Sequence, residues 1–189
     1  MIKETKVVVL DYLPHGYHNM KKIEPIIQAI GYNYFILFEM VANKEVKPQD
    51  IISIDDKERI KYIRRKIKEK DLTNFSKNNL EEVIIDIVKQ RESDFVNFFN
   101  KAVKISIRMH QLELLPGIGK KHVQIILKQR KVPFKSFEDI KKRVGITVDI
   151  ERMFARRIIE ELKGDEKYYL FVHQFPTPAP SKRYFTTGT

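Results

Sequence analysis

The sequence predicts an α+β protein in which a small β-barrel is combined with an all-α domain. Short segments rich in β-branched and aromatic residues dominate the first third of the chain. From about residue 79, apolar residues recur with a helical period instead. A proline–glycine turn near residue 117 then separates two further helical patterns. The 189 residues suffice for one large domain or two small ones.

Residues 1–75 are the predicted barrel domain, because short, closely spaced strands are typical of a five-stranded OB-like barrel. The fourth predicted strand has a basic face and is also compatible with a helix. A fifth β-type segment, KYYLFV, occurs only after the helical patterns. We therefore expect residues 167–173 to return and close the barrel. The four earlier strands are predicted at residues 6–13, 34–42, 50–54 and 60–67.

Residues 76–104 are predicted to form connecting helices. One apolar stripe follows the i, i+3, i+4, i+7, i+8 spacing of an amphipathic helix, and a phenylalanine-rich stripe follows it. The phenylalanines are expected in the core, because a base-stacking surface would interleave them with basic residues. The two stripes are Leu80, Val83, Ile84, Ile87 and Val88, and then Phe95, Phe98, Phe99 and Ala102.

Residues 112–130, LELLPGIGKKHVQIILKQR, hold the most informative motif. Glycine takes positive φ without a Cβ clash, so Gly117 and Gly119 allow a sharp turn and close approach of another backbone. The amides after the turn open a helix and point outward without partners, at the positive end of its dipole. Such an N-terminus binds phosphate, and Lys120 and Lys121 add positive charge. The alternative is a glycine-rich helical corner without a ligand.

The run Leu-Pro-Gly-Ile-Gly-Lys, with Val123 four residues after the second glycine, resembles the helix–hairpin–helix motif of sequence-independent nucleic-acid-binding proteins. A second turn between helical patterns looks like a degenerate copy in which Thr147 replaces the second glycine. Whether this copy binds phosphate or only packs against the first stays open. Residues 105–164 are therefore predicted to form a tandem helix–hairpin–helix domain. Its candidate nucleic-acid-binding residues are Gly117, Ile118, Gly119, Lys120, Lys121, Gly145, Ile146 and Thr147.

The net charge of +11 is concentrated in two segments. Residues 57–70 carry +6 and residues 105–163 carry +7, whereas the remaining segments sum to −2. This distribution is typical of a polyanion-binding surface, although lysines scattered over a heat-adapted protein are an alternative. Further candidate contacts are the basic residues Arg64, Arg65, Lys66 and Lys68 and exposed barrel tyrosines such as Tyr12, Tyr17 and Tyr34.

Several other classes of function lack a sequence signal. There is no cysteine, no run of 18 apolar residues and no signal peptide pattern, so we expect a cytoplasmic protein without a membrane contact. His15 and His18 have no nearby third ligand, and neither a metal nor another cofactor is predicted. Glu138 and Asp139 fit a helix start, and no paired-carboxylate motif accompanies them. We therefore predict no catalytic residues and no enzymatic activity.

Residues 174–189, QFPTPAPSKRYFTTGT, are predicted to form an extended tail, because three prolines and small polar residues disfavour packing. The tail ends in a basic and aromatic group. Its members are Lys182, Arg183, Tyr184 and Phe185.

The motifs DYLPHGY, QAIG, FFNKA, HQLELLPGIGKK, FEDIKKRV and KYYLFV together resemble an archaeal family of unknown function, domain of unknown function 655. The resemblance covers residues of about 6 to 172. It implies an OB-like barrel, a helix–hairpin–helix region and RNA binding, in a family whose genes are associated with translation and transcription genes.

The expected function is therefore sequence-independent binding of nucleic acid, with RNA favoured over DNA and ribosomal RNA or the ribosome as the specific expectation. Two alternatives remain. One is a DNA-binding or DNA-processing protein, and the other is a protein–protein adaptor in a ribonucleoprotein or transcription complex. The sequence does not predict an oligomeric state.

Overall fold

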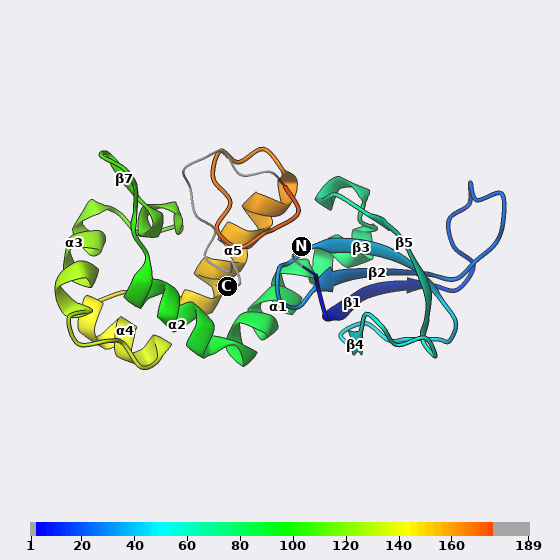
Figure 1. Cartoon of the computed structure of the whole chain (residues 1–189), viewed down its shortest axis with the longest axis horizontal. Helices are drawn as coiled ribbons and strands as arrows, with labels where there is room; N and C mark the ends of the chain where they lie inside the picture. The colour runs from blue at the N-terminus through cyan, green and yellow to red at the C-terminus, as the bar shows by residue number, and fades with distance from the viewer. Residues whose placement is uncertain (1–2, 176–189) are drawn as a thin grey trace.

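The computed structural model describes residues 3–175, in which an antiparallel sheet precedes a mainly helical region (Figure 1). The strands are β1 (Lys6–Leu13), β2 (Ile26–Gly31), β3 (Leu37–Ala42), β4 (Ile51–Ser53), β5 (Ile60–Lys66), β6 (Lys104–Ser106) and β7 (Met109–His110). The α-helices are α1 (Asn74–Gln90), α2 (Glu92–Lys101), α3 (Lys120–Gln129), α4 (Phe137–Val144) and α5 (Ile150–Lys163). Two short 3-10 turns are η1 (Glu69–Asp71) and η2 (Gln111–Leu114). Most of the predicted tail, residues 176–189 with its basic and aromatic group, lies outside the described residues.

The main sheet has five antiparallel strands in the order β4-β1-β2-β3-β5 and curls into a half-barrel. The prediction of β1 is confirmed, and β4 and β5 lie within their predicted segments. The strand β3 is shorter than predicted, because Phe35 has φ +55° and belongs to the turn that precedes it. The strand β2, with the sequence IIQAIG, was not predicted.

The predicted closure of the barrel by residues 167–173 is wrong. These residues form no strand and lie outside the sheet, in which β2 takes the fifth place. Their amides are used differently: the side chain of Glu161 accepts hydrogen bonds from the amides of Leu170, Phe171 and Val172. Amides bound to a carboxylate cannot donate to a neighbouring strand, so the apolar segment packs into the core without pairing.

Each face of the sheet contributes to a separate hydrophobic core. On the inner face, Val7, Ile27 and Met40 lie inside the curl. On the outer face, Leu10 and Ile30 belong to the larger core that continues through the helical region. Because both faces are covered, β2 and β3 are buried along their whole length. Strands of this kind are continuous apolar runs without the alternation of a half-exposed strand.

The helical region is connected to the sheet through α1, whose predicted apolar stripe is confirmed as buried. The helix begins at Asn74, where the side chain of Thr73 accepts a hydrogen bond from the Ser76 amide. The phenylalanines of α2 are buried as predicted, and they contact Phe154 and Phe171. No helix within the described residues is both long and apolar enough to cross a lipid bilayer.

The Glu161 side chain joins α5 to the segment that follows it. It is fully buried, and its Oε1 atom accepts hydrogen bonds from Arg157 Nε at 3.0 Å and from the Leu170 amide at 2.8 Å. The Oε2 atom accepts from the amides of Phe171 and Val172, both at 2.9 Å. Burial raises the pKa of the Glu161 carboxyl, while Arg157 and the three amides oppose that rise. Four donors around two oxygens hold the segment in one position.

Replacement of Glu161 by glutamine tests this arrangement. The amide group of Glu161→Gln would bring N–H donors against backbone donors and leave Arg157 without its buried partner. We expect the free energy of unfolding, measured by urea denaturation, to fall by about 3 kcal/mol. The neighbouring Glu160 forms an ion pair with Lys163 on the surface. Glu160→Gln should therefore change the free energy of unfolding by less than about 0.5 kcal/mol. Equal effects of the two variants would contradict the structural role of Glu161.

Candidate nucleic-acid interface

The turn before α3 is built by one buried residue between two glycines. Ile118 is buried in the helical core, and its amide donates to the carbonyl oxygen of Leu115 at 3.1 Å. Gly117 has φ +87°, a conformation that favours glycine. The helix expected before the turn is the 3-10 turn η2, which follows the β6–β7 hairpin. The first helical half of the predicted motif is therefore a single turn, whereas α3 is a regular helix of ten residues.

The first amides of α3 are open. Gly119 is the N-cap, which has no side chain to cap the helix, and its carbonyl oxygen accepts from the Val123 amide at 3.0 Å. Within residues 3–175, the amides of Lys120, Lys121 and His122 have no hydrogen-bond acceptor. They lie at the positive end of the helix dipole. The amides of this site can therefore donate hydrogen bonds to an anion without breaking bonds within the protein.

The fold does not require a glycine at position 119. Its φ is −100°, which any residue adopts, and a Cβ atom added there would meet nothing within 4 Å. A Cβ on Gly117 would also meet nothing, but there the positive φ accounts for glycine. An open, cap-free glycine at a helix start leaves room for an approaching ligand.

Lys120 and Lys121 are exposed beside these amides. The ion pairs on the neighbouring helix α4 join Lys141 to Asp149 and Arg143 to Asp139. In the described part of the chain, no such pair involves Lys120 or Lys121. Both ammonium groups therefore add positive charge to the helix start without a carboxylate to neutralise it.

The second predicted turn differs from the first. Gly145 has φ +78° and ends α4, and Ile146 is buried, but α5 begins only at Ile150. Its N-cap is Asp149, whose Oδ1 atom lies 3.3 Å from Lys141 Nζ. A carboxylate thus stands at the helix start, where it repels a phosphate. The helix that follows this turn therefore lacks an open, uncharged N-terminus, unlike α3 after the first turn. The turn residues concerned are Gly145, Ile146 and Thr147.

The structure brings the two turns together at one cavity of about 440 Å³. Its lining includes Pro116 and Gly117 from the first turn and Thr147 and Asp149 from the second. The α5 residues that complete the lining include Arg152 and Arg156, which contact Glu81 of α1.

The predicted basic residues lie in β5 or, for Lys68, two residues after it. The strand β5 belongs to the sheet, well away from α3 (Figure 1). Lys66 and Lys68 are exposed. Arg64 and Arg65 both bind the carboxylate of Glu39, which is fully buried in β3. The distance from Arg65 Nη2 to Glu39 Oε2 is 3.2 Å. The structure therefore separates these residues from the α3 turn and uses two of them to neutralise a buried acid.

The barrel tyrosines do not form an exposed stacking surface. Tyr34, which was predicted to be exposed, is buried against His173 with ring centroids 4.7 Å apart. Tyr17 donates a hydrogen bond to Glu39 Oε2 at 2.9 Å, and burial raises the pKa of its hydroxyl to about 12. Tyr12 is half-buried beside the inner core. The predicted exposure of Tyr34 is wrong, because His173 of the C-terminal segment covers its ring.

Residues 3–173 match the family model described as "Protein of unknown function (DUF655)". The chain belongs to this family. It is 41% identical over 171 residues to the uncharacterized protein MJ0038 of Methanocaldococcus jannaschii. The aligned region covers 87% of this chain and 77% of that protein. A crystal structure of Af1531 from Archaeoglobus fulgidus, described as a DUF655 protein, has a TM-score of 0.80 and 40% identity, over 89% of this chain and 99% of that chain. Neither description names an enzyme or a ligand.

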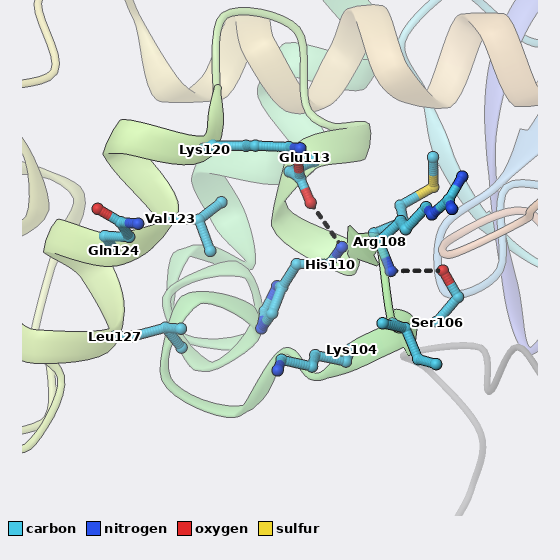
Figure 2. A pocket seen from close by; sticks show the side chains of 11 residues that line it. Lys104, Ser106, Arg108, His110, Glu113, Lys120, Val123, Gln124 and Leu127 are labelled. Atoms are coloured by element: carbon cyan, nitrogen blue, oxygen red, sulfur yellow. Dashed lines mark hydrogen bonds between the residues drawn. The ribbon is translucent and has the colours of Figure 1, made fainter.

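A second cavity of this DUF655 protein was not predicted. It measures about 440 Å³ and lies between the β6–β7 hairpin and α3 (Figure 2). At the tip of the hairpin, Ile107 is 99% exposed. The only sequence signal was an alternation of apolar and polar residues, VKISIRM, which is typical of a strand. The lining residues are Lys104, Ser106, Ile107, Arg108, Met109, His110, Glu113, Lys120, Val123, Gln124 and Leu127.

Metal ligands do not converge in the described part of this DUF655 protein. Residues 3–175 hold no group of three or more His, Asp or Glu side chains that could bind a metal ion. His15 and His18 lie in the loop between β1 and β2, where both are exposed.

The two turn glycines are predicted to differ in their effect on stability. Gly117→Ala forces a Cβ into a left-handed conformation, so we expect the free energy of unfolding to fall by about 1 kcal/mol. Gly119→Ser places a hydroxyl at an N-cap of extended backbone, so the same quantity should stay unchanged or rise by roughly 0.3 kcal/mol. Denaturation by urea measures both. A destabilised Gly119→Ser would mean that the fold itself requires this glycine.

Proposed function

We propose that this protein binds nucleic acid without sequence preference, through the open amides at the start of α3. The observation that supports this most directly is the combination at Gly119–Lys121. The fold does not require this glycine, and among residues 3–175 the amides that follow it have no acceptor and the two lysines form no ion pair. A phosphate oxygen at this position would accept hydrogen bonds from the amides of Lys120 and Lys121. Contacts of this type fix the position of a nucleic acid but do not read its bases.

The charge distribution supports a polyanion as the ligand. The segment from residue 105 to residue 163 carries a net charge of +7, and it contains both turns. A charge of this sign concentrated around a helix N-terminus attracts phosphate over a distance of about 10 Å at 0.1 M salt. Much of the binding energy should therefore come from counterion release, which makes affinity strongly dependent on salt.

The helix–hairpin–helix interpretation belongs to this proposal. The first turn keeps the glycine, isoleucine and glycine of that motif, although η2 takes the place of its first helix. The second turn packs through Ile146 and carries Asp149. In the proposal the first turn grips the phosphates, and the second supports it from across the shared cavity.

The OB-like interpretation of the sheet also belongs to the proposal. A five-stranded, partly open antiparallel barrel is the OB architecture, and the curled sheet has these features. In OB domains, the face of strands 2 and 3 binds oligonucleotides. Here β2 and β3 are buried on both faces, so we assign the phosphate contacts to the helical end. The exposed Lys66 and Lys68 offer a second, weaker basic surface.

RNA is the favoured ligand in this proposal, with structured RNA such as ribosomal RNA as the first candidate. The cavity beside α3 supports this choice, because RNA presents unpaired bases in loops and bulges more often than DNA does. The competing proposal of a DNA-binding protein predicts equal or tighter binding to DNA of the same sequence. Titration of matched RNA and DNA hairpins distinguishes the two.

The first test reverses the charge of the two lysines. Lys120→Glu with Lys121→Glu should weaken binding to RNA of any sequence by roughly a hundredfold at 0.1 M salt. The dependence of log K on log salt should become shallower, with a slope less negative by about two. Fluorescence anisotropy with labelled RNA measures both. The control is Lys44→Glu with Lys47→Glu, an equal change of net charge on exposed residues of the sheet end. An identical loss in the control would attribute the effect to total charge.

The second test uses Gly119→Ser. Its hydroxyl would accept hydrogen bonds from the first amides of α3 and occupy the space above them. We expect roughly tenfold weaker RNA binding without any loss of stability. Gly117→Ser serves as the comparison, since it strains the turn but leaves the amides open. Unchanged binding by Gly119→Ser would exclude the amides as the phosphate site.

A further inference from the structure

The tip of the β6–β7 hairpin breaks the usual rules for a tight turn. Ser106 pairs with Met109, so Ile107 and Arg108 form a two-residue connection. Connections of this length favour asparagine, aspartate and glycine. Ile107 is instead β-branched, apolar and 99% exposed. A local rule broken without gain to the fold is expected at functional sites.

The cavity below this tip has an apolar wall. Figure 2 shows Val123 and Leu127 pointing from α3 toward His110, the last residue of β7. Val123 is nearly buried, whereas Leu127 is partly open to the cavity. Met109 and Ile107 add apolar surface from the hairpin. A flat, apolar group fits such a wall better than a hydrated ion does.

The rim of the cavity is positively charged. Lys104, Arg108 and Lys120 line it, and Glu113 is the one acid among the lining residues within the described chain. The Glu113 carboxylate is already engaged, because its Oε2 atom accepts a hydrogen bond from the His110 amide at 2.7 Å (Figure 2). The occupant that complements this cavity is therefore apolar on one side and anionic on the other.

His110 adds a polar group whose charged form is disfavoured in this position. Its Nδ1 atom accepts a hydrogen bond from the Leu112 amide at 3.2 Å, so the neutral ring carries its proton on Nε2. Burial, together with the nearby charge of Arg130, lowers the pKa of His110. A neutral imidazole in the wall allows a base to approach without a buried charge.

The cavity is continuous with the proposed phosphate site, because Lys120 belongs to both. It follows α3 from Lys120 to Leu127, a distance of roughly 10 Å along the helix. This length is comparable to that of one nucleotide from its phosphate to the far edge of its base.

We propose that the cavity between the β6–β7 hairpin and α3 holds one unpaired nucleotide of the bound strand. Its base lies against Val123, Leu127 and the hairpin, and its phosphate lies beside Lys120. Ile107 enters the gap that the base leaves in the stack, as apolar side chains do in other complexes. This inference rests on the proposed function and adds the kind of nucleic acid that is selected. A protein partner would lack the phosphates that three rim cations complement.

Two RNA hairpins that differ only by a single bulged 2-aminopurine test this assignment. The full chain should bind the bulged hairpin roughly tenfold more tightly than the paired one, with a change in 2-aminopurine fluorescence. Ile107→Ser should lose both the preference and the fluorescence change while keeping its affinity for the paired hairpin. It leaves the fold intact, since Ile107 is fully exposed. Ile23→Ser, which changes another exposed isoleucine in the loop between β1 and β2, should behave like the unmodified protein.

Three results would overturn the assignment in distinguishable ways. Equal binding of both hairpins with unchanged fluorescence would exclude the nucleotide cavity and leave the phosphate site standing. Absence of binding to either hairpin would exclude the proposed function as well. A photoreactive group at position 107 that cross-links to protein and never to RNA in a cell extract would identify the hairpin as a protein-docking element.

Discussion

The buried carboxylate of Glu161 is the interaction on which the arrangement of the chain depends. It binds Arg157 on its own helix and three amides of the segment that follows. That segment then carries Phe171 into the aromatic core and reaches the turn between β2 and β3, where the His173 amide donates to the carbonyl oxygen of Tyr34 at 3.2 Å. One desolvated acid thus fixes how the C-terminal segment spans the helical region and the sheet. Hydrophobic contacts alone are less directional.

The sequence predicted elements whose signal is local. The β-branched run of β1, the apolar stripe of α1 and the buried phenylalanines of α2 depend on residues a few positions apart. Burial on both faces removes the alternation that marks a strand from β2 and β3 alike. The strand β3 was still predicted because it lies in the long apolar run YFILFEMVA, whereas β2 was missed because its run, IIQAIG, is short and interrupted by Gln28. Residues 167–172 have the composition of a strand, but the Glu161 side chain accepts hydrogen bonds from the amides of Leu170, Phe171 and Val172. Composition cannot reveal that competition, because it is decided by which side chain is buried beside them.

The same division applies to the candidate site. The turn from Gly117 to Lys121 was predicted as a unit because glycine, proline and lysine at this spacing have a local physical meaning. The partner of Arg64 and Arg65, Glu39, is about 25 residues away in the sequence, so their use as counterions could not be foreseen. The cavity beside α3 was not predicted for a related reason. Its two walls are the hairpin and the helix, and how they pack together is decided by tertiary structure. Ile107 is conspicuous only once its exposure is known.

The separation of the two basic surfaces has a consequence for the size of ligand that engages the whole protein. The helix α3 lies at the helical end of an elongated body, and β5 lies in the sheet on its other side (Figure 1). A short oligonucleotide reaches one end only. A large folded polymer can place two distant segments at both ends at once, and the second contact then forms at high local concentration. On the proposed function, the protein would then separate the two bound parts of the polymer by the length of its own body.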